Sequence, residues 1–268
     1  MGAVERNPSR FPDFLILMRK FFVLWQREVA TYFRSPIAYV ILFFFLVLAG
    51  VIFYANLLLM NQAPTSFSAV EVYFNTPFFW FIFVPPIPLL TMRLFAEEYK
   101  LGTIESLMTA PVRDMQVLLA KYFGALFFFV VLWAPTALYF AIFQWRAQLP
   151  AASSPGVWIG AYSMLLLFGM FFIAIGCLAS ALTRNQVVAA IISFVSIATL
   201  ACWGFYERWF PNVSPLLRDL TEYLSPIRHM GMFSQGLLDT RPVVLYVSLT
   251  VLVLFVTFQV FQYRRWKV

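Results

Sequence analysis

Charged residues, histidine and cysteine are scarce in this chain, and each scarcity excludes a class of protein. Only 12% of its 268 residues are charged, and it has one histidine and two cysteines. A soluble domain carries about 25% charged residues, so a soluble globular fold is excluded. Cys177 and Cys202 are too few for a disulfide framework or a zinc site. We expect both to be small buried apolar residues.

Long apolar runs make up most of the chain instead. Hydrophobic residues account for 62% of the sequence. A helix needs about 20 apolar residues to cross the hydrocarbon core of a bilayer, and only helices or closed barrels satisfy the backbone there. The first run is too long for a signal-peptide core, so we expect it to be retained. The runs predict an all-α integral membrane protein with one domain over 1–268 and six transmembrane helices, at about 37–60, 72–92, 117–145, 157–183, 186–206 and 242–263.

The distribution of lysine and arginine predicts the orientation of these helices. If the N-terminus is cytoplasmic, 14 of the 19 Lys and Arg residues fall in cytoplasmic segments. The outer segments then include a long loop at 207–241. An excess of basic residues marks the cytoplasmic side, so both termini are expected there. The net charge of +7 is thereby explained by topology and contact with anionic lipid, and we expect no nucleic-acid partner.

The interiors of the predicted spans contain no charged side chain. Gradient-driven carriers keep ionisable groups at mid-membrane, and an intramembrane enzyme needs converging titratable groups. Both classes are therefore disfavoured, and we expect no catalytic residue, metal or cofactor in this chain. Small polar residues in the spans, among them Ser180 and Ser193, are expected to join helices to one another.

An amphipathic helix is predicted at 13–34, before the first span. Asp13 can cap it, and most of its apolar residues lie on one side. This pattern is typical of a helix lying in the membrane interface. The alternative is an amphipathic helix packed against its own protein, which has the same periodicity. Ser35 and Pro36 are expected to break the helix before the first span.

Prolines interrupt the second and third spans. Pro85, Pro86 and Pro88 lie in the second span and Pro135 lies in the third. Each deletes a backbone hydrogen bond and bends the helix. Two interpretations stay open, a flexible or pathway-lining span and a static kink.

A short helix is predicted in the 207–241 loop. Ser225 can cap it and Pro226 suits its first turn. We expect it to run to about Gly236 as a helix partly inserted in the outer leaflet, with His229 in an interfacial or structural role. Its apolar residues are expected to be exposed, namely Ile227, Met230, Met232, Phe233 and Leu237.

The segment 93–113 is charged although it lies between two apolar runs. The second span is expected to continue as helix through Tyr99 and to stop at Gly102. Thr103 can cap a second short helix, which Pro111 ends. Asp114 is expected to cap the helix that becomes the third span. The pattern predicts a short cytoplasmic helix lying crosswise to the spans.

The residues of this segment follow the pattern R-x-F-A-E-E-x-x-x-G-T-x-E-x-L-x-x-x-P. The pattern resembles the type-2 ABC transporter permeases (the ABC-2 family), most closely their gliding-motility and nitrous-oxide-reductase-maturation branch (GldF- and NosY-like). Two other parts agree, the entrance to the first span from Glu28 to Tyr39 and the loop from Ser225 to Asp239. The resemblance therefore covers nearly the whole chain.

The resemblance implies a membrane-spanning permease subunit of an ATP-driven exporter in the bacterial cytoplasmic (inner) membrane. It implies a second permease, identical or related, and two cytoplasmic ATPase subunits that bind ATP and Mg. This chain lacks the phosphate-binding loop of an ATPase. The alternative is an ABC-type mechanotransmitter or membrane anchor that moves partners without translocating a substrate. The implied contacts with the ATPase are Arg93, Phe95, Glu97, Glu98, Gly102, Thr103, Ile104, Glu105, Leu107 and Pro111 in the coupling loop, and Glu28, Tyr32, Arg34, Ser35 and Pro36 near the end of the interfacial helix.

Overall fold

A computed structural model describes residues 10–62, 67–102, 113–147, 155–204 and 221–265. Within these residues the structure is helical and has no strand. Six of its helical segments are long and apolar enough to cross a membrane, as expected. They are Pro36–Gln62, Pro77–Leu101, Asp114–Arg146, Pro155–Leu182, Gln186–Trp203 and Thr240–Tyr263.

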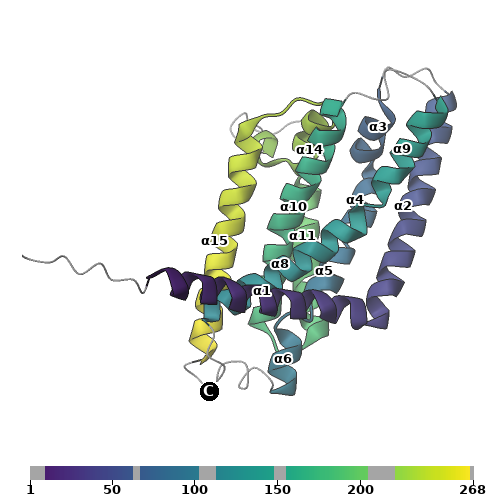
Figure 1. The fold of residues 1–268 in the computed structure, drawn as a ribbon. Coiled ribbons are helices and arrows are strands. Elements are labelled where there is room, and N and C mark those ends of the chain that lie inside the picture. The colour runs from purple at the N-terminus through teal and green to yellow at the C-terminus, as the bar shows by residue number, and fades with distance from the viewer. Residues whose placement is uncertain (1–9, 63–66, 103–112, 148–154, 205–220, 266–268) are drawn as a thin grey trace, which may run out of the picture.

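The spans stand side by side, and one helix lies across the end of the bundle (Figure 1). This crosswise helix is α1, and the last helix, α15, ends near it. The described chain therefore begins and ends at the same end of the bundle, which we call the base. The helices are α1 Arg10–Arg34, α2 Pro36–Gln62, α3 Ala69–Asn75, α4 Pro77–Phe83, α5 Pro86–Thr91, α6 Ala96–Leu101, α8 Asp114–Trp133, α9 Thr136–Ala147, α10 Pro155–Leu182, α11 Gln186–Trp203, α14 Pro226–Ser234 and α15 Thr240–Arg265.

The helix boundaries confirm most of the predicted breaks. α1 ends before Ser35 and α2 begins at Pro36. Turns at residues 84–85 and 134–135, each containing a proline, also separate α4 from α5 and α8 from α9. Three predictions of where a helix begins were wrong. The first helix begins at Arg10, ahead of Asp13; a separate helix, α3, precedes the second span; and Arg113, not Asp114, is the N-cap of α8.

α10 lies at the centre of the bundle, where it contacts α5, α8, α11, α14 and α15. Small residues allow these close approaches. A Cβ built on Gly176 would lie 2.1 Å from the hydroxyl oxygen of Thr91 on α5. A Cβ on Gly160 would lie 2.0 Å from the carbonyl oxygen of Phe233 on α14. Only glycine fits at these two crossings, because a methyl group there would overlap the neighbouring helix.

The two cysteines differ from the expectation that both are buried. Cys177 lies on α10 and is buried, whereas Cys202 lies near the end of α11 and is exposed. The difference follows from the position of the helices, since most of α11 faces outward while α10 is surrounded. Apolar composition predicts that a residue is in a span, but it does not predict which face of the span is covered.

Candidate functional site at the base of the bundle

α1 packs along α8 through aromatic side chains. The rings of Phe21 and Phe123 lie 6.4 Å apart, and those of Tyr32 and Phe128 lie 5.2 Å apart. A Cβ on Gly124 would lie 3.0 Å from the Cβ of Glu28, so the helices approach closely at this point. This contact fixes the C-terminal half of α1 against a membrane-spanning helix.

α1 also carries exposed apolar residues. Met18, Phe22 and Val23 are each about half exposed. The contact with α8 agrees with a helix packed against its own protein. Exposed apolar side chains are of the kind that an interfacial helix presents to lipid, and that interpretation stays a prediction.

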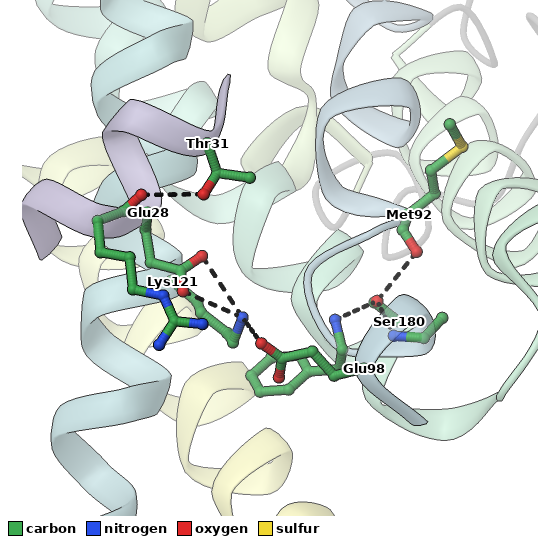
Figure 2. A network of polar contacts seen from close by, with 9 residues as sticks. Glu28, Thr31, Met92, Glu98, Lys121 and Ser180 are labelled. Atoms are coloured by element: carbon green, nitrogen blue, oxygen red, sulfur yellow. Dashed lines mark hydrogen bonds and ion pairs between the residues drawn. The ribbon is translucent and has the colours of Figure 1, made fainter. Parts of the chain in front are cut away.

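A buried lysine joins α1, α6 and α8. Lys121 Nζ lies 2.7 Å from Glu98 Oε1 and 3.3 Å from Glu28 Oε1 (Figure 2). The Lys121 side chain is only 4% exposed, and the two glutamates are 17% and 18% exposed. A buried ammonium is tolerated only when its charge is paired and its protons are bound. The three helices must therefore keep this arrangement while Lys121 is charged.

The chain turns between α5 and α6, and Ser180 of α10 forms hydrogen bonds with the backbone groups of this turn. Its hydroxyl accepts hydrogen bonds from the backbone N–H groups of Phe95 and Ala96 at 3.0 and 3.1 Å. The same hydroxyl donates to the carbonyl oxygen of Met92 at 3.2 Å (Figure 2). The expectation of one continuous helix through Tyr99 was wrong, because the helix ends at Thr91 and restarts at Ala96.

Tyr32 links α1 to the end of α5, just before this turn. Its hydroxyl donates a hydrogen bond of 2.9 Å to the carbonyl oxygen of Leu90. Burial, chiefly, raises the pKa of Tyr32 well above that of an ordinary phenol. The hydroxyl therefore stays protonated and remains a donor.

Five predicted coupling residues lie in the described part of the chain. Phe95 is fully buried, and its ring centroid is 5.7 Å from Lys121 Nζ. Glu98 binds Lys121, while Arg93 and Glu97 line a cavity beside it. Gly102 has φ of 70° and ends α6, as predicted. The other five, Thr103, Ile104, Glu105, Leu107 and Pro111, lie outside the described residues.

The predicted residues of the interfacial helix are divided between the surface and a group that we call the Lys121 cluster, which consists of Glu28, Tyr32, Glu98 and Lys121. Glu28 and Tyr32 face α8 and the turn before α6. Arg34 is exposed at the end of α1, Ser35 is the connecting residue, and Pro36 starts α2. Only the first two of these residues belong to the cluster.

Sequence reasoning missed Lys121 as a site residue. It is one of the 14 Lys and Arg residues counted as cytoplasmic, at the start of the span predicted at 117–145, and its burial on α8 was not expected. A signal was present, because Lys121 shares helical spacing with the buried residues Leu118, Ala125 and Phe128. A lysine on an otherwise apolar helix face predicts a buried partner of opposite charge. Ser180 was expected to join helices but was not placed at the turn.

The opposite end of the bundle corrects the prediction for the loop helix. Ser225 caps α14 and Pro226 is its first residue, as expected. However, Met230 and Phe233 are buried, because α14 packs against α10 and α3 and does not lie free at the membrane surface. His229 is structural, with Nδ1 lying 3.1 Å from the hydroxyl of Tyr246.

The ion pairs of the Lys121 cluster hold α1, α6 and α8 together. Glu98 Oε2 is buried and has no hydrogen-bond partner among the described residues. Within the described residues, His, Cys, Asp and Glu form no group of three that could hold a metal ion.

Comparison with known proteins identifies the family of this chain. A family profile described as "ABC-2 family transporter protein" matches residues 27–199. Two curated relatives, "Probable multidrug ABC transporter permease YbhR" from Escherichia coli strain K12 and from Escherichia coli O157:H7, are each 27% identical over 143 residues. The alignment covers 53% of this chain but only 37% of each relative. Because the profile covers more than half of the chain, including Glu28, Glu98 and Lys121, the chain belongs to the ABC-2 family of transporter permeases.

Proposed function

We propose that this chain is the membrane-spanning permease subunit of an ATP-driven exporter, and that a separate ATPase drives it from the base of the bundle. The observation that carries the proposal is the Lys121 cluster. It joins the crosswise helix α1, the short helix α6 and the spanning helix α8. α6 leads directly into the segment 103–112, whose sequence resembles a coupling helix.

The charge distribution supports a cytoplasmic base. The excess of Lys and Arg falls in segments at the ends of the chain and around 93–121, and basic residues mark the cytoplasmic side. ATP is available on that side. The ATPase subunits, with their ATP and Mg, are therefore proposed to bind beneath α1 and α6 in the bacterial inner membrane.

The geometry indicates how a push on α6 reaches the spans. The turn at 92–95 is fixed to α10 by Ser180. α6 can therefore pivot about the turn while Glu98 moves Lys121 and α8 with it. The buried ion pairs oppose separation, since breaking one leaves an unpaired buried charge. Displacement of α6 is thereby passed to the third span and to α1.

The outward faces of the bundle support a second permease subunit. α2, α11 and α15 are mostly exposed along their apolar lengths. They are available to lipid and to an identical or related permease. The closer relationship to the GldF- and NosY-like branch is part of this proposal and rests on the pattern at 93–111 and the loop residues around Ser225.

The proposal is tested by Glu98→Gln, which removes the charge of the α6 contact and keeps its size. The chain is purified with its ATPase, and ATP hydrolysis by the complex is compared with hydrolysis by the ATPase alone. We expect the complex to assemble and its regulation of hydrolysis to fall several-fold, because α6 no longer holds Lys121. Asp239→Asn, the same change at the opposite end of the bundle, is the control. Unchanged regulation in Glu98→Gln would rule out a coupling role for the cluster.

A further inference from the structure

The two carboxylates of the Lys121 cluster are bound unequally. Both oxygens of Glu28 accept hydrogen bonds from Lys121 Nζ, at 3.3 and 3.4 Å. Glu98 accepts one hydrogen bond from the same atom, at 2.7 Å through Oε1 (Figure 2). An ammonium group has three N–H donors, and these three contacts use all of them. Glu98 Oε2 therefore receives no donor from Lys121.

Glu98 Oε2 has no other partner among the described residues, and it is shielded from solvent. An ionised carboxylate oxygen needs a donor, and burying it without one costs more than burying a neutral group that lacks a partner. Because no solvent reaches this oxygen, water does not supply the donor in this conformation. A proton bound directly to Oε2 removes the charge and needs no additional space.

The charges that are in contact within the cluster do not balance. Lys121 contributes one positive charge, whereas Glu28 and Glu98 contribute two negative charges. The three side chains are largely buried, so solvent screens their charges little. Proton uptake by Glu98 leaves one ammonium and one carboxylate in contact, and this pair carries no net charge.

The charges farther out act on Glu98 more weakly than these contacts do. Arg27, Arg93 and Glu97 line the adjoining cavity of about 310 Å³, and none of the three forms an ion pair with Glu98. Arg27 is exposed, so water screens its charge, and the charges of Arg93 and Glu97 have opposite signs. The titratable and charged side chains around Glu98 are Arg27, Glu28 and Tyr32 on α1, Arg93 in the turn, Glu97, Tyr99 and Lys100 on α6, Lys121 on α8 and Cys177 on α10.

The cavity gives protons a route to Glu98. The Glu98 side chain is 18% exposed and is part of the cavity lining. A small movement of the carboxyl group is therefore enough to exchange a proton with solvent.

We propose that Glu98 is a proton-binding site at the base of the bundle. Oε2 takes up one proton from solvent, and Oε1 remains the acceptor of the hydrogen bond from Lys121. The O–H bond is the only covalent bond that forms, and Glu98 loses its negative charge. The contact between α6 and α8 then changes from an ion pair to a weaker hydrogen bond with a neutral acceptor. The proton site does not depend on an ATPase, whereas any effect on coupling rests on the proposed function.

Carbon-13 NMR of the purified full chain in detergent tests the site without an ATPase. Glutamate is labelled at the carboxyl carbon, and each resonance is assigned by its loss in Glu98→Gln, Glu28→Gln or Glu97→Gln. The pH is lowered from about pH 8 to about pH 5, a range in which exposed glutamates stay mostly ionised. We expect the Glu98 resonance to move to the position of a protonated carboxyl group.

Glu97 is the matched control, because it lines the same cavity and does not contact Lys121. Its resonance and that of Glu28 are expected to stay at the ionised position. A Glu98 resonance that does not move, or movement of the Glu28 resonance instead, would overturn the proposal. If Glu98→Gln does not fold, Glu28 and Glu97 are still assigned by their own variants. The absence of any other resonance that moves would then overturn it.

Thermal unfolding gives an independent readout. Folding leaves Glu98 Oε2 without a donor, so we expect the folded protein to bind this proton more readily than the unfolded chain does. The stability of the wild type relative to Glu98→Gln should therefore rise as the pH falls. We expect Glu98→Gln to have the higher thermal midpoint at about pH 8 and this difference to shrink toward about pH 5. His229 titrates in both proteins and cancels in the comparison. A difference that is independent of pH would contradict proton binding by Glu98.

Discussion

Lys121 shows how one residue determines the arrangement of three helices. An ammonium group with almost no exposure is stable only because carboxylates from α1 and α6 converge on it. The cluster carries three charges, two of them negative, and the two carboxylates would repel each other without the lysine. We therefore expect Lys121 to determine how α1, α6 and α8 are placed as much as it stabilises the folded protein.

Lys121→Met tests this dependence at the residue scale. The variant keeps the volume of the side chain but leaves Glu28 and Glu98 facing each other. We expect a loss of about 3 kcal/mol in the free energy of unfolding, measured as a lower thermal midpoint of the purified protein in detergent. Combining it with Glu28→Gln and Glu98→Gln should restore most of the loss, because no buried charge remains unpaired. Lys100→Met, on an exposed lysine of α6, is the control, and an equal loss in that variant would contradict the account.

The limits of sequence reasoning are clear for these residues. The pattern around 93–98 indicated Arg93, Phe95, Glu97 and Glu98, because charge between apolar runs is conspicuous. Nothing in the local pattern paired Glu98 with Lys121, which lies 23 positions away. That pairing depends on how α6 and α8 are placed by the turn at 92–95, a tertiary feature that spacing along the chain does not encode.

At the scale of elements, α14 illustrates how packing overrides an amphipathic pattern. Its apolar residues suit a membrane surface, but α3 and α10 cover them. Asn75 of α3 donates a hydrogen bond of 2.9 Å to the hydroxyl of Ser234 on α14. Gly160 of α10 permits direct contact with the α14 backbone. The cap and the first-turn proline were predictable because they are local, whereas the burial of Met230 and Phe233 was not.

The docking of α14 should depend on pH through His229. Burial, followed by the nearby charge of Arg228, lowers the pKa of His229 to about 4, although Asp239 opposes the shift. The unfolded chain, with a histidine pKa near 6.5, binds the proton more readily than the folded protein does. Stability is therefore complete above about pH 6.5 and is lost as the pH falls from 6.5 toward 4.

Thermal unfolding at two pH values measures this effect. Between pH 7.5 and pH 5 we expect the wild type to lose about 2 kcal/mol through His229. His229→Gln, which cannot be protonated, should lose that much less over the same interval. The same pH dependence in the wild type and in His229→Gln would show that other groups are responsible.

In the other elements, too, local backbone features were predictable and tertiary packing was not. Proline breaks near residues 85 and 135, the Ser35–Pro36 break and the Gly102 stop were predicted, because each is a property of backbone covalent geometry. The number of spans was predicted from run length. Which faces of the spans are covered could not be predicted, and Cys202 is an example of the error that results.

At the scale of the whole molecule, the packed core and the proposed coupling site lie in different parts of the bundle. α10 is packed on most sides, with glycines where α5 and α14 cross it. The two ends of the described chain, α6 and the Lys121 cluster lie together at the base (Figure 1). Our proposal places the input of energy from an ATPase at this base.

Assembly with an ATPase is the most direct test of this account. The tagged chain is purified in mild detergent from cells that also produce candidate ATPase subunits, and bound proteins and ATP hydrolysis are measured. The account predicts that an ATPase is retained by the wild type and that changing the 103–112 segment releases it, while the chain still inserts into the membrane. Repeated recovery of the intact chain without an ATPase, or retention that is unaffected by changes at the base, would contradict it.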